Sequence, residues 1–276
     1  MKVSLIDVDS KIPNLALMRC STYHKKRGDS VKLGYEPLFD SPDLCYVSKM
    51  FTFTPEPDYL PDCEIVKGGT GYNPAARLPF PEYDRIMPDY GIYGCDYAIG
   101  RFTRGCPNRC PWCVVWRMDG NDVRHVADLS DFWCGQPVVR LLDDNIMADE
   151  DEFVADCRQL HDAGVRTIWE ALDIRHVNEH TARALSSVKS EKSIHIAWDG
   201  PAQDGYAERG IEVLARNGIK PWRLMFYVLV GFNTTPEYDM HRILTLHRLG
   251  ANPFVMPYFD NGVKSEYAKH LARWCN

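Results

Sequence analysis

Residues 106–113 read Cys106-Pro107-Asn108-Arg109-Cys110-Pro111-Trp112-Cys113, so three of the ten cysteines fall within this short stretch. It begins shortly after Tyr97–Phe102, an apolar run that predicts a strand. Three closely spaced thiolates can hold three irons of a 4Fe–4S cluster and leave the fourth iron open. A structural zinc site would instead need a fourth protein ligand, for which His125 is the nearest candidate. The spacing therefore indicates a metal centre, of iron and sulfide or of zinc, on the loop after this strand.

The overall composition is that of an ordinary globular protein. Of the 276 residues, 45% are apolar and 25% are charged, which excludes wholesale disorder, collagen and coiled coil. The formal net charge of -6 gives no general case for nucleic-acid binding. No apolar run approaches the roughly 20 residues of a membrane span, and Asp7 comes too early for a signal peptide. We therefore expect a cytoplasmic protein with no membrane partner.

The other seven cysteines are scattered along the chain. Disulfides are rare in the cytoplasm, and an isolated cysteine is most often a small buried hydrophobe. We expect that role for Cys20, Cys45, Cys63, Cys95, Cys134, Cys157 and Cys275.

Apolar runs that predict strands recur along the chain beyond residue 96. They are Tyr97–Phe102, Pro137–Leu142, Val165–Ala171, Ser193–Trp198, Arg223–Val230 and Pro253–Tyr258. After the first run, their centres lie about 30 residues apart, the length of one βαβ step. A full eightfold barrel takes about 250 residues, and residues 97–276 are too few for one. The sequence therefore predicts a six-unit (β/α)6 partial TIM barrel with a C-terminal helix, whose site lies at the carboxyl ends of the strands.

The first part of the chain, residues 1–72, predicts a small Rossmann-like α/β domain. Strands are expected at Val3–Val8, Ser30–Leu33, Leu44–Ser48 and Cys63–Val66, with a helix after the first. The turn Gly68-Gly69-Thr70-Gly71 follows the last strand, where it either cradles a phosphate or simply reverses the chain. Residues 73–96 predict a stiff linker, because they hold four prolines, namely Pro74, Pro79, Pro81 and Pro88.

The Cys-x3-Cys-x2-Cys spacing, on the loop after the first strand of a six-unit β/α barrel, resembles the radical S-adenosylmethionine (SAM) superfamily. Thr103-Arg104-Gly105 before the first cysteine and Trp112 before the third add to the likeness. The resemblance implies that Cys106, Cys110 and Cys113 ligate three irons of a 4Fe–4S cluster, while SAM chelates the fourth. The reduced cluster would cleave SAM to a 5′-deoxyadenosyl radical, which abstracts hydrogen from the substrate. An external electron donor such as a flavodoxin or ferredoxin is implied as well, whereas no residue of the chain is assigned a catalytic role.

The same resemblance assigns SAM-binding roles to residues near the cysteines and at the second strand end. Trp112 would pack near the adenine, with loop packing as its other interpretation. Asp143, Asp144 and Asn145 follow the second predicted strand, where the superfamily commonly binds the SAM amino group. Helix capping is the alternative for these residues, and it suits Asn145 or Asp149 best.

The later strand ends supply further expected SAM contacts. Arg175 holds a carboxylate by a bidentate contact, or else it only neutralises Glu170 and Asp173. Asp199 ends the fourth strand and is expected to reach the SAM ribose or the substrate. Gly231 ends the fifth strand and resembles the glycine of a motif that supports adenine in this superfamily.

Five arginines lie within residues 101–125 against two aspartates, which leaves this stretch with an excess of positive charge. They are Arg101, Arg104, Arg109, Arg117 and Arg124. They either bind an anionic substrate, such as a phosphorylated metabolite or nucleic acid, or balance the anionic cluster and the SAM carboxylate. We predict a radical SAM enzyme whose substrate is unknown, with a nucleotide or nucleic acid as the first candidate. A non-catalytic iron–sulfur scaffold or sensor is the alternative.

The N-terminal unit resembles a shortened version of the cobalamin-binding domain that some radical SAM proteins carry. Members that hold cobalamin through histidine use an Asp-x-His-x-x-Gly loop after the first strand. That place reads Asp7-Val8-Asp9-Ser10-Lys11-Ile12 here, with neither histidine nor glycine. We therefore expect no His-ligated cobalamin. Over nearly its whole length the chain resembles an uncharacterised group of small radical SAM proteins of bacteria and their phages, through Phe51–Thr54, Gly68–Tyr72 and Leu142–Asn145.

Overall fold

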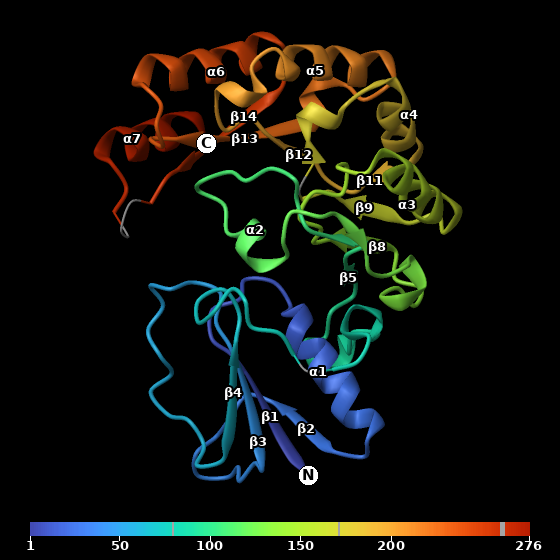
Figure 1. Ribbon diagram of the computed structural model, residues 1–276, viewed down its shortest axis with the longest axis vertical. Helices are drawn as coiled ribbons and strands as arrows, with labels where there is room; N and C mark the ends of the chain where they lie inside the picture. The colour runs from blue at the N-terminus through green and yellow to red at the C-terminus, as the bar shows by residue number, and fades with distance from the viewer. Residues whose placement is uncertain (79, 171, 260–262) are drawn as a thin grey trace.

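The computed structural model describes residues 1–78, 80–170, 172–259 and 263–276, and it shows a mixed α/β fold with parallel sheets (Figure 1). Pro79 of the predicted linker and Ala171 of the third predicted strand lie outside these residues. None of the helices within the described ranges is both long and apolar enough to span a membrane.

Four parallel strands form the N-terminal sheet, in the order β2-β1-β3-β4. They are β1 (Lys2–Asp7), β2 (Ser30–Leu33), β3 (Leu44–Ser48) and β4 (Glu64–Gly68), each close to a predicted strand. Helix α1 (Leu15–Lys26) packs on this sheet, and Leu5, Leu17 and Tyr46 are buried between them. Asn14 caps the helix by accepting hydrogen bonds from the first backbone amides, so the helix begins one residue later.

Residues 73–96 fold back onto this N-terminal unit. Phe80 is buried and stacks on Tyr23 of α1, with ring centroids 3.9 Å apart. Asp89 accepts a hydrogen bond of 2.6 Å from Ser21, also on α1. The segment therefore completes the core of the N-terminal unit, although it is rich in proline. The division of the chain at residues 72 and 96 stays a prediction.

The second part of the chain holds two further parallel sheets, in the orders β11-β9-β8-β5 and β10-β12-β13-β14. Their strands are β5 (Ala98–Gly100), β8 (Val138–Leu141), β9 (Arg166–Ile168), β10 (Leu172–Asp173), β11 (Lys189–Ser190), β12 (Ile194–Ala197), β13 (Leu224–Val230) and β14 (Asn252–Pro257). Each of the six predicted runs contains a strand; β5, β8 and β9 neighbour one another in one sheet, and β12, β13 and β14 do so in the other. The third run differs from the prediction, because β9 ends early and β10 begins a separate sheet. Closure into a six-unit partial barrel therefore stays our interpretation.

Helices lie along the outer side of these strands in Figure 1. They are α3 (Glu150–Asp162), α4 (Glu179–Ser187), α5 (Tyr206–Arg216), α6 (Pro236–Arg248) and α7 (Glu266–Cys275). Asp149 caps α3 by accepting a hydrogen bond from the backbone amide of Glu152, so Asn145 is not the cap. Between helices and strands lies the main hydrophobic core, in which Trp169, Trp198 and Phe226 are fully buried.

A short antiparallel pair, β6 (Thr103–Arg104) and β7 (Arg124–His125), joins the two ends of the cysteine stretch. Helix α2 (Val115–Met118) lies within the loop that this pair closes. Single 3-10 turns complete the described elements, namely η1 (Tyr83–Arg85), η2 (Tyr90–Ile92), η3 (Leu129–Asp131), η4 (Ile174–His176), η5 (Pro201–Gln203) and η6 (Pro221–Arg223).

The scattered cysteines are less uniformly buried than expected. Cys20, Cys45 and Cys157 are buried, as predicted. Cys134 is exposed, because it lies in the turn between η3 and β8, and that part of the prediction is wrong. The remaining three, Cys63, Cys95 and Cys275, are half-buried.

Candidate functional site

A cavity of about 590 Å³ lies at the carboxyl ends of β8, β10, β12 and β13, next to the cysteine loop. Its volume is within the range of small-molecule sites. The predicted site residues that line it are Cys106, Cys110, Trp112, Cys113, Asp144, Asn145, Arg175 and Asp199. The structure thus brings together residues from four separate segments, as expected for the carboxyl edge of parallel strands.

The cysteine loop is held closed at its base. Thr103 pairs with His125 and Arg104 with Arg124 across the β6–β7 ladder. Gly105 follows with a φ of 92°, and a Cβ atom there would lie 2.3 Å from the backbone oxygen of Asp122. Only glycine fits this close approach, which sets the path of the chain into the first cysteine.

The three thiols lie in a partly buried environment on the wall that also holds Asp144, Arg175 and Asp199. Burial raises the pKa of the Cys110 and Cys113 thiols. The Cys106 sulfur accepts hydrogen bonds from the side-chain amides of Asn108 at 3.5 Å and Asn145 at 3.6 Å. Hydrogen bonds to ligand sulfurs tune iron–sulfur clusters, so these amides suit a cluster ligand.

The spacing of the thiols bears on the choice between iron and zinc. Thiolates bound to one zinc at about 2.3 Å lie about 4 Å from one another. Among the described residues, the three Sγ atoms do not form a group within 4.8 Å of one another. His125, the expected fourth zinc ligand, does not line the cavity but lies 2.7 Å from Glu152. Within the described residues, the cysteines and His125 therefore do not form a preassembled four-ligand zinc site.

Asp143 and Asp144 are adjacent but have different surroundings. One carboxylate oxygen of Asp143 accepts hydrogen bonds from the backbone amides of Phe102 (3.0 Å) and Thr103 (2.6 Å). Asp143 is buried, which raises its pKa to about 6. Contrary to the prediction, it does not line the cavity. Asp144 does line the cavity, and it also accepts a hydrogen bond of 2.8 Å from the amide of Gly105. Asp143 thus ties β8 to β6, and Asp144 alone faces the ligand space.

Asn145 lines the cavity beside the first cysteine and is almost fully buried. Its amide nitrogen also lies 3.2 Å from Asp173 Oδ2, to which it donates. Its carbonyl oxygen is buried without a hydrogen-bond partner among the described residues. An unpaired buried acceptor is costly, so this oxygen is available to a donor that enters the cavity.

Arg175 and Asp173 form a bidentate pair on the cavity wall. The guanidinium donates to the two carboxylate oxygens at 2.9 Å and 2.7 Å. Burial alone would raise the pKa of Asp173, but the hydrogen bonds and charge of Arg175 lower it. Glu170 is not part of this pair, because it contacts Arg140 and His195 instead. The neutralisation that the sequence suggested for all three residues therefore applies to two of them.

Asp199 lines the cavity from the end of β12, and burial raises its pKa to about 6. Gln203 holds this strand end, since its side-chain oxygen accepts hydrogen bonds from the amides of Asp199 (2.7 Å) and Gly200 (3.2 Å). Sequence reasoning missed Gln203 and also Asn108, which donates to Asp173 at 2.8 Å. Both are polar residues on loops at the strand ends. The search for polar residues that follow a predicted strand, which found their neighbours, would have included them if it had covered the whole of each loop.

Aromatic rings form another part of the wall. Trp112 meets Phe232 edge to face, with ring centroids 5.1 Å apart, and Phe232 meets Tyr258 at 4.7 Å. Gly231 does not line the cavity, contrary to its predicted contact with a ligand. Its φ of 85° instead turns the chain at the end of β13 so that Phe232 reaches the cavity.

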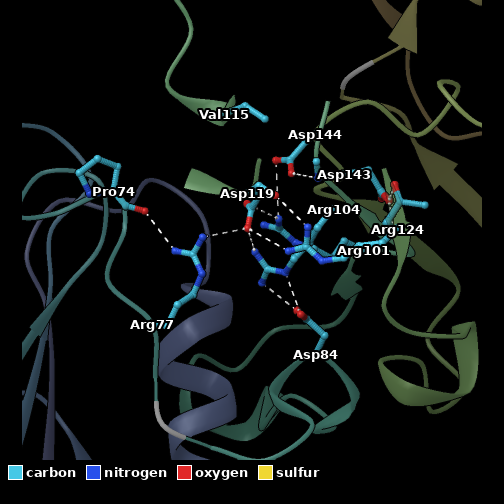
Figure 2. Close-up of polar contacts among 12 residues, drawn as sticks. Pro74, Arg77, Asp84, Arg101, Arg104, Val115, Asp119, Arg124, Asp143 and Asp144 are labelled. Atoms are coloured by element: carbon cyan, nitrogen blue, oxygen red, sulfur yellow. Dashed lines mark hydrogen bonds and ion pairs between the residues drawn. The ribbon is translucent and has the colours of Figure 1, made fainter. Parts of the chain in front are cut away.

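Most of the arginines near the cysteine loop pair with aspartates. Figure 2 shows Arg104 between Asp84 (2.7 Å) and Asp119 (2.9 Å), and Arg101 beside Asp119 and Asp144, each at 3.7 Å. Arg124 donates to the backbone oxygen of Asp119 at 2.8 Å. Arg101 and Arg104 are thus balanced by carboxylates, and Arg124 lies 4.0 Å from the Asp119 carboxylate, so these three fit the charge-balancing interpretation.

The remaining two arginines have separate surroundings. Arg109 lines the cavity. The Arg117 guanidinium lies over the ring of Trp116, 4.7 Å from its centroid.

Comparison with known proteins supports the fold. No protein-family model and no curated protein matches this sequence. Among solved structures, the chain is similar to TsrM, a radical SAM methyltransferase from Kitasatospora setae. It shares the fold of TsrM. A TsrM structure with cobalamin and a [4Fe-4S] cluster bound matches with a TM-score of 0.67 and 13% identity, over 92% of this chain and 74% of TsrM.

A second TsrM structure, with tryptophan substrate and the SAM analogue aza-SAM bound, gives the same TM-score at 14% identity. It covers 93% of this chain and 73% of TsrM. At this identity the likeness to TsrM shows the fold alone, and the chemistry must be argued from the site.

Proposed function

We propose that this chain is a radical SAM enzyme that reductively cleaves SAM at a 4Fe–4S cluster and abstracts hydrogen from a substrate. The observation that carries the proposal is the placement of Cys106, Cys110 and Cys113 on the wall of a 590 Å³ cavity at the carboxyl ends of parallel strands. The fold shared with TsrM supports it.

The three cysteines and their surroundings fit the cluster. Among the described residues their sulfurs do not form a group within 4.8 Å of one another, and the amides of Asn108 and Asn145 donate to Cys106. When bound, the reduced cluster supplies the electron that converts SAM to methionine and a 5′-deoxyadenosyl radical. The protein excludes water and holds the reacting groups in place.

The cavity offers suitable partners for each end of SAM. We assign the SAM amino group to Asp144 and to the unpaired carbonyl oxygen of Asn145, both of which accept hydrogen bonds. The carboxylate then meets Arg175, and the ribose hydroxyls meet Asp199. Trp112 is placed to pack near the adenine, because an aromatic face supports a flat base.

One residue of the cavity wall bears on the charge of the substrate. Arg109 lines it, and a guanidinium at this position supports an anionic substrate such as a nucleotide. We further propose an external electron donor such as a flavodoxin or ferredoxin, and a cytoplasmic location, where such donors occur.

Cobalamin held by a histidine does not fit the N-terminal unit. His24 is the single histidine of residues 1–72. It is buried, and its ring nitrogens contact Asp29 (2.8 Å) and the hydroxyl of Tyr46 (3.1 Å). The loop after β1 is likewise occupied, since Asp9 accepts hydrogen bonds from the amides of Met50 and Phe51. We therefore propose that this chain works without His-ligated cobalamin.

The test is anaerobic reconstitution with iron and sulfide, reduction with dithionite, addition of SAM, and quantification of 5′-deoxyadenosine. We expect the nucleoside from wild type and from Cys134→Ala, which changes an exposed cysteine, but not from Cys106→Ala. A cluster that yields no nucleoside and whose EPR signal does not change with SAM would support the scaffold or sensor alternative.

A further inference from the structure

A second group of metal-ligand side chains lies outside the cavity. His125 of β7 and Glu152 and Asp156 of α3 each place one ligand atom within 4.8 Å of the others. None of the three lines the 590 Å³ cavity. Glu152 and Asp156 are four residues apart, so they share one face of α3.

Asp156 is the unusual member of the group. Its side chain is 0% exposed, and neither carboxylate oxygen has a hydrogen-bond partner among the described residues. Burial and the neighbouring charges of Asp143, Glu152 and Asp128 raise its pKa to about 9. A buried carboxylate is normally paired or bound to a metal, so Asp156 lacks the partner that its burial requires.

His125 faces the same space through its Nδ1 atom. Its Nδ1 lies 2.7 Å from Glu152 Oε1, yet this buried nitrogen forms no well-aligned hydrogen bond. Its other nitrogen, Nε2, lies 3.4 Å from Asp128 Oδ1. Asp128 is held in turn by Gln159, whose amide donates to it at 3.1 Å. In the tautomer that carries its proton on Nε2, beside Asp128, Nδ1 would be the ligand atom, as in the carboxylate–histidine–metal arrangement of many metal sites.

We propose that His125, Glu152 and Asp156 bind a divalent transition-metal ion. Imidazole nitrogen and carboxylate oxygen bind zinc at about 2.0–2.2 Å, which puts ligand atoms about 3–4 Å apart. The three atoms already lie within 4.8 Å, so small side-chain shifts bring them into range. The imidazole ligand favours zinc or iron(II) over magnesium and calcium, and the two carboxylates also suit manganese.

The position of the ion gives it a structural role. His125 belongs to β7, which pairs with β6 and closes the base of the cysteine loop. Glu152 and Asp156 belong to α3, which packs on the main core through Phe153 and Cys157. The ion joins the end of the cysteine loop to this helix and neutralises the buried carboxylate.

The experiment uses a Cys106→Ser/Cys110→Ser/Cys113→Ser chain, so that the cluster thiols cannot hold the metal. The protein is incubated anaerobically with Zn²⁺, Mn²⁺ or Fe²⁺ in turn, desalted, and analysed for metal per chain and for Tm. We expect about one ion per chain for one of these metals, and a higher Tm when that metal is present. Absence of retained metal from all three incubations overturns the proposal.

Variants in the same background locate the ion. His125→Ala and Asp156→Asn should each lose the metal and its effect on Tm. The matched control is His161→Ala, which removes an exposed histidine of α3 and should retain both. If Asp156→Asn does not fold, Glu152→Gln changes a partly exposed side chain and must lose the metal with its circular dichroism unchanged. Metal retained by His125→Ala and Glu152→Gln overturns the proposal.

Discussion

The side-chain amide of Asn145 lies 3.6 Å from the Cys106 sulfur and 3.2 Å from Asp173, while its carbonyl oxygen has no partner in the described part of the chain. One residue thus contacts a proposed cluster ligand and leaves an acceptor for the proposed SAM amino group. Asn145 therefore links the cysteine loop to the ends of β8 and β10, as Asn108 does from the loop itself.

We therefore expect Asn145→Ala to weaken SAM use without loss of the cluster. Partners of metal ligands typically contribute about 10–100-fold to affinity or activity, and a loss of that size is expected in kcat/KM for SAM. The measurement is the rate of 5′-deoxyadenosine formation against SAM concentration, together with iron per chain. Asn217→Ala, on the surface next to Glu179, is the control. An unchanged kcat/KM would contradict the assignment of Asn145 to SAM.

The second prediction concerns Gly105, whose backbone conformation sets the path of the chain into the first cysteine. A Cβ atom at this residue would lie 2.3 Å from a backbone oxygen of Asp122, whereas Gly135, which also has a positive φ of 103°, has open space. Gly135→Ala should cost only the backbone strain of about 1–3 kcal/mol. Gly105→Ala should in addition displace the loop and lower iron and sulfide per chain. Equal cluster content in the two variants would show that the loop tolerates the clash.

The sequence was sufficient to predict the cysteine loop and the strand ends around it, because apolar runs and their spacing are local patterns. It was not sufficient to separate Asp143 from Asp144. Successive residues near a strand end point to opposite sides, and only the strand register shows that Asp143 accepts from Phe102 and Thr103 while Asp144 lines the cavity.

Contacts between residues far apart in the sequence could not be predicted from local patterns. The local excess of arginine was visible in the sequence, but Arg104 pairs with Asp84, from a segment that its prolines marked as a linker. The pairing depends on how residues 73–96 fold back, which no local pattern reports. For the same reason the sequence suggested His125 only as a fourth zinc ligand alongside the three cysteines, and it did not predict that His125 lies beside Asp156.

The raised pKa of Asp143 leads us to predict that the free energy of unfolding depends on pH. Burial raises its pKa to about 6 from the usual 3.8, so the folded state disfavours the charged form. Its stabilising contribution is complete below pH 4 and is lost as the pH rises through 6, by about 3 kcal/mol for a shift of about two units. Asp143→Asn keeps an acceptor for Thr103 but does not titrate.

Urea unfolding at several pH values from 4 to 7 measures this effect. Relative to wild type, Asp143→Asn should gain stability as the pH rises, because only wild type then carries the buried charge. A difference that stays constant over this range would mean that Asp143 titrates normally in the folded protein.

The network in Figure 2 provides the last prediction, about the contact between the N-terminal unit and the cysteine loop. Arg104 bridges Asp84 and Asp119, and the Asp119 carboxylate is fully buried. Arg104→Met removes one partner and leaves buried carboxylates less well paired, which typically costs about 3–5 kcal/mol. Arg216→Met breaks an exposed pair with Glu179 and should cost about 1 kcal/mol or less. Thermal or urea unfolding compares the two variants. If both lose the same small amount, the remaining arginines around Asp119 are enough to hold the two parts of the chain together.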